Sequence, residues 1–158
     1  MCIRDRYNET NGHDIAPTPV VGVVGMHPNL KNRPPGMALS SGMALVLLGN
    51  DADLDTAMGG SRWAWEIGGC KDGRLPEFDL DQAVRTASFV ASLVQEGHCR
   101  AVHDIGEGGI GVAVAEMAIA GRIGIRVFGY DDHVSMFNES GGRVLVCLLY
   151  TSPSPRDS

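Results

Sequence analysis

The sequence predicts an α/β or α+β domain, because short apolar runs alternate with segments of helical periodicity. Residues 43–48 and 99–102 are apolar and typical of strands. Residues 80–96 repeat apolar side chains near the helical period of 3.6, and residues 111–121 are apolar almost throughout, which is typical of a helix packed on a sheet. A chain of 158 residues can form one domain, or one domain and part of another.

The composition favours a globular protein of the reducing cytoplasm. The 19 acidic residues outnumber the 13 basic ones and no Lys/Arg cluster occurs, which argues against binding to nucleic acid or an anionic membrane. No apolar run approaches the roughly 20 residues of a membrane helix, and the N-terminus lacks a signal-peptide core. The four cysteines lie too far apart for a C-x-x-C zinc or redox site, so we expect reduced thiols: Cys2, Cys70, Cys99 and Cys147.

The first third of the chain predicts two strands. Pro17 and Pro19 favour an extended entry into residues 20–25, a β-branched run that predicts a buried strand. Residues 26–42 form a turn-rich loop with an edge strand near residues 37–40. Residues 43–48 follow as a strand expected to be buried on both faces.

The middle of the chain predicts a linker and then a helix. The turn Gly59-Gly60-Ser61 is either an ordinary turn or a backbone site for an anion. Trp63 and Trp65 are expected to pack at a domain junction rather than stack on a substrate. Asp79 is expected to cap a helix over residues 80–96, which ends at Gly97.

The last third predicts a second helix and two more strands. We expect residues 111–121 to be buried against the sheet, with Glu116 as an interface, capping or functional residue. Residues 123–128 alternate like a strand, Asp131 or Asp132 caps a short segment through Phe137, and another strand begins at residues 143–146.

The stretch His103 to Ile110 is the best candidate for a site. It combines the end of a strand, a carboxylate, a glycine turn and a helix start, and could present Asp104, Glu107 and free backbone N–H groups to a ligand. Glu139 again places an acid beside two glycines, and such loops suit a magnesium nucleotide site. The alternative is that Asp104 caps the following helix and Glu139 is solvated.

His103 carries a second open alternative. Beside Asp104 it could act as a general base, but a histidine satisfied within the core or a turn is the other interpretation, because no Ser or Cys nucleophile stands near it in the pattern.

Both ends differ from the rest of the chain. Residues 1–6 and 148–158 resemble translated vector sequence, and the Pro-rich C-terminal stretch cannot continue a helix or strand. We therefore expect a non-native leader and a non-native disordered tail, the alternative being a natural floppy tail.

Segments spread over residues 7–147, in order, resemble phosphoribosylformylglycinamidine synthases, in particular their small bacterial and archaeal form. These segments are Tyr7-Asn8-Glu9-Thr10, Pro17 to Gly25, Leu47-Leu48-Gly49, Gly59-Gly60-Ser61, Pro76, Asp79-Leu80, His103 to Gly109, Ala115-Glu116-Met117-Ala118, Asn138-Glu139-Ser140 and Arg143-Val144.

The resemblance implies the end of an AIR synthase-like N-terminal (A-type) domain at residues 7–55, a linker at 56–76 and a truncated C-terminal (B-type) domain at 77–147, all in the second half of the parent enzyme. It implies an ATP- and Mg²⁺-dependent ligase of purine biosynthesis that amidates formylglycinamide ribonucleotide. The implied partners are the remaining half of that enzyme, a glutaminase subunit, a small accessory subunit and the ribonucleotide substrate.

By the family's pseudo-repeat, the implied nucleotide contacts line an auxiliary cleft. They are Asp104, Gly106, Gly108, Gly109, Glu139 and Ser140, with Asp104 and Glu139 as metal ligands. No catalytic residue is carried over, because residues 1–6 stand where the family has a G-N-V-S-like segment. The fragment is therefore expected to be inactive alone. The alternatives are a nucleotide-binding or interface module without catalysis, or an AIR synthase or selenophosphate synthetase relative.

Overall fold

The computed structural model describes residues 9–14, 21–26, 35–49 and 57–148. The chain divides into two units, residues 1–30 and residues 31–158. In the first unit, strands β1 (Glu9–Thr10) and β2 (His13–Asp14) pair antiparallel. Asn11 and Gly12 between them have φ values of 53° and 77°, and Asn-Gly is the pair that a tight hairpin of this hand favours.

The buried strand predicted for residues 20–25 is wrong over the described residues 21–26. These residues form no strand, and Val24 is 98% exposed. A strand is stabilised by a neighbour that accepts and donates backbone hydrogen bonds, and no described residue pairs with this segment. The apolar run therefore predicted a buried strand where the described residues are exposed.

The second unit is built on a three-stranded antiparallel sheet in the order β3-β5-β4. The strands are β3 (Ala44–Leu48), β4 (Cys99–Asp104) and β5 (Val144–Leu148), and Val146 of β5 lies between Val46 and Val102 of its neighbours. The predicted strand at 43–48 is thus confirmed, but it lies at an edge and is only partly buried, not buried on both faces. The central strand extends through Leu148, one residue beyond the predicted end of the domain.

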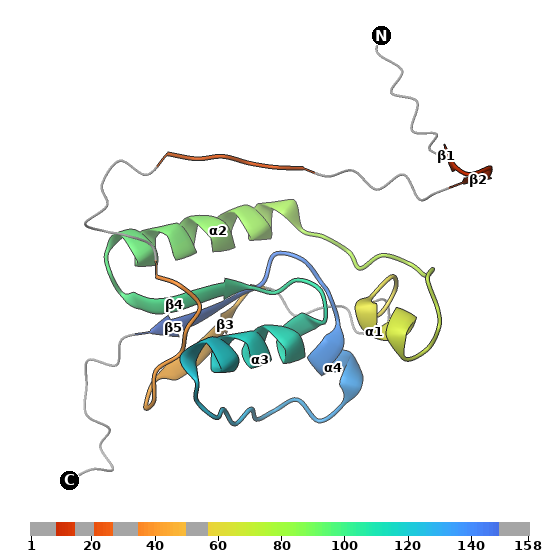
Figure 1. Ribbon diagram of the computed structural model, residues 1–158. Helices are drawn as coiled ribbons and strands as arrows, with labels where there is room; N and C mark the ends of the chain where they lie inside the picture. The colour runs from red at the N-terminus through yellow and green to blue at the C-terminus, as the bar shows by residue number, and fades with distance from the viewer. Residues whose placement is uncertain (1–8, 15–20, 27–34, 50–56, 149–158) are drawn as a thin grey trace. The chain divides into compact units, whose positions relative to one another are not determined.

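Helices cover both faces of this sheet (Figure 1). Helix α2 (Leu80–Gln95) lies along one face and helix α3 (Gly109–Gly121) along the other. The main core lies between the sheet and α3, and its buried members are Leu39, Ala101, Ile105, Ile110, Ala113, Val114, Met117, Leu145 and Cys147. Two short helices, α1 (Arg62–Glu66) and α4 (His133–Phe137), lie near the start of α3. The sheet and α3 therefore present the glycine turn at one end of the unit.

Local signals set the ends of α2 as the sequence predicts. The Asp79 carboxylate accepts the backbone N–H of Gln82 at 2.9 Å, which is an N-cap contact. The helix stops before Gly97, whose φ of 75° is a conformation that glycine adopts without strain. Asp132 caps α4 in the same way, by accepting the N–H of Ser135 at 2.8 Å. These three predictions are confirmed.

The burial of α3 is one-sided, although its sequence is apolar all round. Ile110 and Met117 are buried against the sheet, whereas Val112 and Ile119 on the other side are exposed. Full burial would need a second layer outside α3, and the described residues do not supply one. The prediction is right for the face toward the sheet and wrong for the opposite face.

Two predicted strands form no ladder in the structure. Residues 123–128 are irregular, and residues 123–126 line an open cavity of about 480 Å³ together with Leu45 of β3 and residues of the preceding segment 39–43. Residues 37–40 are also irregular, but the Leu39 N–H donates to the Met117 carbonyl, and the neighbouring Gly36 carbonyl accepts from Val102. Residues 123–128 have the apolar alternation of a strand, but no described strand pairs with this segment.

Candidate functional site

The glycine turn after β4 depends on two residues in the left-handed region. Gly108 has φ 78° and Gly109 has φ 63°, and α3 begins there without a side-chain cap. A Cβ on Gly109 would lie 2.5 Å from the carbonyl oxygen of Asn138, so the turn packs directly on that backbone. Glycine is therefore needed both for the backbone angle and for the close approach.

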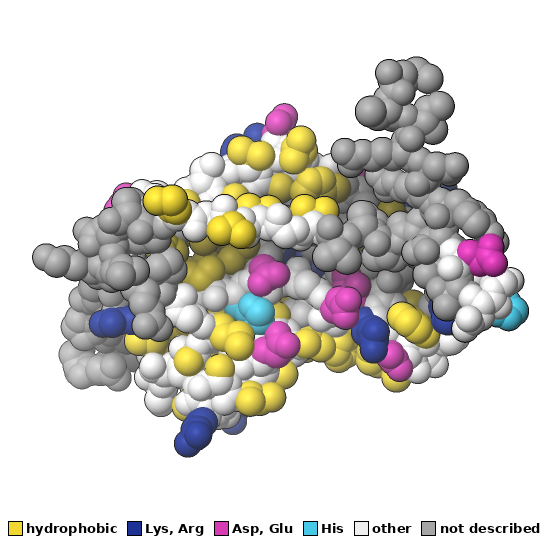
Figure 2. Space-filling view, turned by 45° about the horizontal axis from the view of Figure 1, so that its top comes forward, with side chains coloured by type: hydrophobic (Ala, Val, Ile, Leu, Met, Phe, Trp, Pro, Cys, Tyr) yellow, Lys and Arg dark blue, Asp and Glu magenta, His cyan; other side chains and the backbone are white. Residues whose placement is uncertain are grey.

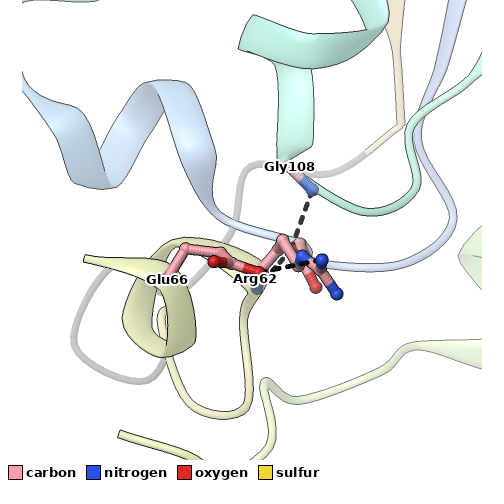
Figure 3. Close-up of polar contacts among 4 residues, drawn as sticks. Arg62, Glu66 and Gly108 are labelled. Carbon is pink, nitrogen blue, oxygen red and sulfur yellow. Dashed lines mark hydrogen bonds and ion pairs between the residues drawn. The ribbon is translucent and has the colours of Figure 1, made fainter. Parts of the chain in front are cut away.

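The Glu139 carboxylate is bound to this turn, at the N–H of Gly108, which Figure 3 labels beside Arg62. Its Oε1 accepts the N–H of Gly108 at 2.8 Å and the N–H of Arg62 at 2.7 Å. Arg62 is the first residue of α1, and Gly108 directly precedes α3. The half-buried Glu139 is thus neither solvated, as the alternative interpretation held, nor free of partners.

The expectation of free N–H groups is wrong for Gly108 and Gly109. The Gly108 N–H donates to Glu139, and the Gly109 N–H donates to the Gly106 carbonyl at 3.1 Å. Both glycines are buried, and buried donors are almost always paired. The turn therefore satisfies these two donors from within the protein.

Asp104 remains the accessible carboxylate of the turn. Its side chain is 85% exposed, and its Oδ1 lies 3.3 Å from the Nδ1 of His103. It does not cap α3, since the N-cap position belongs to Gly108. Glu107 is also exposed, and acidic side chains gather around a histidine on the face shown in Figure 2. Among the predicted metal contacts, Asp104 is the one open to a ligand.

His103 is held between two carboxylates. Its Nε2 lies 2.8 Å from Oε2 of Glu116, a residue of α3, and its side chain is 19% exposed. The contact of Nε2 with Glu116 links β4 to α3, while Nδ1 faces the exposed Asp104. This geometry favours the structural interpretation over a general base, and gives Glu116 the role of an interface residue.

Ser140 lies beneath the turn rather than on its surface. It is 5% exposed, and its hydroxyl has no hydrogen-bond partner among the described residues. The buried Arg143 fixes the surrounding backbone, since its Nε donates to the Ser140 carbonyl and its Nη2 donates to the Asn138 carbonyl. The structure thus brings Glu139 onto Gly108 but leaves the Ser140 side chain buried.

The turn Gly59-Gly60-Ser61 starts α1. The Ser61 hydroxyl accepts the N–H of Ala64 at 3.1 Å and donates to the Met58 carbonyl at 2.8 Å, so this serine is an N-cap. The first N–H of α1, that of Arg62 beside the turn, meets an anion, and this contact does not test whether the turn itself binds an anionic ligand. That anion is the protein's own Glu139.

Aromatic stacking joins α1 to α4. The Trp63 ring lies 4.6 Å from Phe137 and 5.5 Å from His133, centroid to centroid, in stacked orientation. Trp65 is half exposed, with the Arg62 guanidinium 5.1 Å and the Lys71 ammonium 4.9 Å from its ring centroid. The sequence indicated packing for Trp63 but not its partners, because they lie about seventy residues away and no local pattern records such a contact.

Burial disfavours the reactive thiolate form of the two buried cysteines, Cys99 and Cys147. Burial raises the pKa of the Cys147 thiol, and burial together with the nearby Cys147 raises that of Cys99. Both changes favour the neutral thiol over the reactive thiolate. This agrees with the absence of a cysteine from the predicted site.

Of the two expected magnesium ligands, Asp104 fits a metal ion more readily than Glu139 does. The exposed Asp104 offers the hard oxygen ligands that Mg²⁺ prefers. The Oε1 atom of Glu139 is already the acceptor of two N–H groups. Within the described ranges, no three His, Cys, Asp or Glu side chains gather in a group that could hold a metal. Any Mg²⁺ held here would therefore depend on Asp104 and on oxygens of its ligand.

Comparisons with known proteins agree on the fold. The family described as AIR synthase related protein, C-terminal domain, matches residues 40–149. The chain aligns to T. maritima PurL complexed with FGAR with a TM-score of 0.57 and 22% identity, over 80% of this chain and 22% of that one. It aligns to T. maritima PurL complexed with ATP with a TM-score of 0.52 and 18% identity, over 81% and 20%. At these identities the structures support the fold alone.

Sequence relatives are more similar. The phosphoribosylformylglycinamidine synthase subunit PurL of Granulibacter bethesdensis is 40% identical over 92% of this chain. The protein of the same name from Mycolicibacterium vanbaalenii is 38% identical over 94%. The chain spans about a fifth of the length of each. No helix in the described part is long and apolar enough to cross a membrane. The chain belongs to the family of AIR synthase related proteins, as a C-terminal-type domain similar to part of PurL.

Proposed function

We propose that this chain is part of an ATP-dependent amidoligase that converts formylglycinamide ribonucleotide to formylglycinamidine ribonucleotide. The observation that carries the proposal is the 40% identity to a PurL subunit over 92% of the chain. In this reaction ATP phosphorylates the amide oxygen of the substrate. Ammonia then adds to the amide carbon that bears this oxygen, and phosphate leaves. ADP is the other product. We place the parent enzyme in the cytoplasm.

The name of the same relatives supports a parent enzyme of several subunits. Each of these relatives is named as a subunit, so we infer that the reaction is carried out by a complex of several subunits. We propose that a glutaminase subunit supplies ammonia and that a small accessory subunit completes the complex with the remaining half of the parent enzyme. Because the chain spans a fifth of its relatives, we expect it to be inactive alone.

Of the expected nucleotide contacts in the turn, we propose the exposed Gly106, with Asp104 as the contact to Mg²⁺, because the N–H groups of Gly108 and Gly109 are bonded within the protein. When bound, Mg²⁺ would neutralise and bridge phosphate oxygens. The accessible Asp104 carboxylate supports its part in this proposal. Glu139 and Ser140, the two other expected contacts, lie at the same turn, but the Oε1 of Glu139 already accepts two backbone N–H groups and the Ser140 hydroxyl is buried.

A chimaera tests the proposed function. The segment of Granulibacter bethesdensis PurL that matches this chain is replaced by residues 9–148, and product formation from formylglycinamide ribonucleotide, ATP and ammonia is measured. We expect activity within about tenfold of the parent, equivalent to about 1.4 kcal/mol of transition-state stabilisation. A chimaera that folds but forms no product would refute the proposal. The isolated 158-residue chain is the control and should form none.

A second candidate is a nucleotide-binding or interface module without catalysis. The engagement of the Gly108 N–H by Glu139 favours it, because that donor is not free for a phosphate. Calorimetry with Mg²⁺-ADP decides between the two roles for the turn. Binding that Asp104→Ala weakens at least tenfold supports a nucleotide site, and no binding by the folded chain supports an interface role alone.

A further inference from the structure

Three segments far apart in the sequence meet at one carboxylate oxygen. The Oε1 atom of Glu139 accepts from Arg62, 77 residues away, and from Gly108, 31 residues away. The distances of 2.7 Å and 2.8 Å are those of charge-assisted hydrogen bonds, which are stronger than neutral ones. Figure 3 shows the resulting junction between the start of α1 and the glycine turn.

Both donors lie where helices leave N–H groups without intrahelical partners. Arg62 opens α1, and Gly108 is the N-cap position of α3, where no side-chain cap exists. An anion at such a place is favoured by the partial positive charge of the helix start. The Glu139 carboxylate thus serves two helix starts with one atom.

A second and independent contact joins the same segments. Trp63 of α1 stacks on Phe137 of α4, two residues before Glu139, with 4.6 Å between ring centroids. A Cβ on Gly111 of α3 would lie 2.6 Å from the Phe137 ring, so this ring also touches the start of α3. Apolar packing by Phe137 and the carboxylate of Glu139 therefore both hold α1 and the start of α3 to the segment 133–139.

We propose that Glu139 is a positioning residue that fixes the linker helix α1 against the glycine turn, and is not a metal ligand. The Oε1 atom faces two N–H hydrogens, and the positive ends of these dipoles repel a cation from that atom. Through the turn, Glu139 sets the backbone that follows the exposed Asp104. The hydrogen bonds carry this inference, and it stands whether or not the proposed function is correct.

Amide hydrogen exchange of the full chain tests the role. Glu139→Ala removes the acceptor, so we expect the Arg62 and Gly108 amides to exchange at least about tenfold faster and together. Glu139→Gln keeps an oxygen acceptor and should retain most of the protection of both amides. Trp63 fluorescence should shift to the red in Glu139→Ala as α1 loosens, and should shift little in Glu139→Gln. If Glu139→Ala does not fold, Glu139→Asp replaces it, because its shorter side chain cannot reach both donors.

The matched control is Glu66→Gln. Glu66 pairs with the Arg62 side chain at 2.8 Å on the same helix, but it accepts neither backbone N–H. Its substitution should leave the exchange of both amides unchanged. Unchanged protection of Arg62 and Gly108 in Glu139→Ala would overturn the proposal.

Mg²⁺-ADP calorimetry on the same variants separates positioning from ligation. A positioning role predicts that Glu139→Gln, which keeps the turn, changes the affinity less than threefold. A loss of binding in Glu139→Gln with both amides still protected would identify a metal ligand and overturn the proposal. If the wild-type chain binds no Mg²⁺-ADP, the nucleotide site of the proposed function fails while hydrogen exchange still decides the role of Glu139.

Discussion

Gly109 shows how one residue can be required for two separate reasons. Its φ of 63° is costly for any residue with a Cβ, and that Cβ would approach the Asn138 and Met136 carbonyl oxygens at 2.5 and 2.9 Å. We expect Gly109→Ala to lower the free energy of unfolding by at least about 2 kcal/mol. Urea denaturation monitored by circular dichroism measures this change.

Gly106→Ala is the matched control in the same turn. Its Cβ would meet no atom closer than 3.9 Å, and its φ is not positive. We expect a change within about 1 kcal/mol, of either sign. Equal losses in the two variants would show that the backbone angle and the close approach at Gly109 are not the cause.

The candidate residues of the site differ in how far the sequence could predict them. The glycines and Asp104 follow from a local pattern, and the structure places them at the end of β4 as expected. The pairing of His103 with Glu116, and of Glu139 with Gly108 and Arg62, could not be predicted. Each pairing joins residues of different elements, so it depends on how those elements pack.

Among the elements, α4 has an N-cap whose contribution to stability we expect to depend on pH. Its N-cap Asp132 accepts the N–H of Ser135, and this backbone hydrogen bond is the main cause that lowers the pKa of Asp132 below 3.8. A carboxyl group whose pKa is lower in the folded than in the unfolded state stabilises the fold at pH values above its unfolded-state pKa. This stabilisation is lost as the pH falls through the folded-state pKa. The cap should therefore be complete above about pH 4 and weaken below it.

Asp132→Asn tests this dependence, because asparagine keeps a capping oxygen but does not titrate. We expect the difference in urea midpoint between wild type and Asp132→Asn to be constant from pH 5 to 7 and to narrow below pH 3.8. A difference that widens as the pH falls would contradict the assigned sign.

The helix with its own end signals was predicted well, whereas predicted strands formed only where the fold supplies a neighbouring strand. Helix α2 carries a cap, a helical period and a terminal glycine, and its predicted range matches the structure within one residue. Residues 21–26 carry only a β-branched run and residues 123–128 only an apolar alternation, and neither segment forms a strand. A helix satisfies its own backbone, whereas a strand requires a neighbour.

For the whole molecule, the exposed apolar faces of α2 and α3 predict self-association. Ile119 is 75% exposed, and Leu80, Val84 and Phe89 are each more than half exposed. Apolar area of this kind marks surfaces that are covered in an assembly or that aggregate when left open. We expect the isolated chain to self-associate at concentrations near 100 µM, on the order of those at which exposed apolar surface drives aggregation.

Sedimentation velocity of the double variant Val84→Glu with Ile119→Glu checks this expectation. The variant should shift toward monomer, because a charge resists burial in an apolar contact. Ser88→Glu adds the same charge to an exposed site on α2 without removing apolar surface, and should leave the association unchanged. A wild-type chain that stays monomeric would refute the prediction.

The sequence by itself determined the α/β character, the helix α2 with both of its ends, the three strands of the sheet, the glycine turn and the family resemblance. These depend on short-range properties, namely side-chain periodicity, caps and glycine conformation. Only the tertiary structure decided which apolar runs are buried, and which donors the Glu139 carboxylate meets. Burial and pairing join segments as much as 77 residues apart, so they depend on the packing of whole elements and leave no local trace.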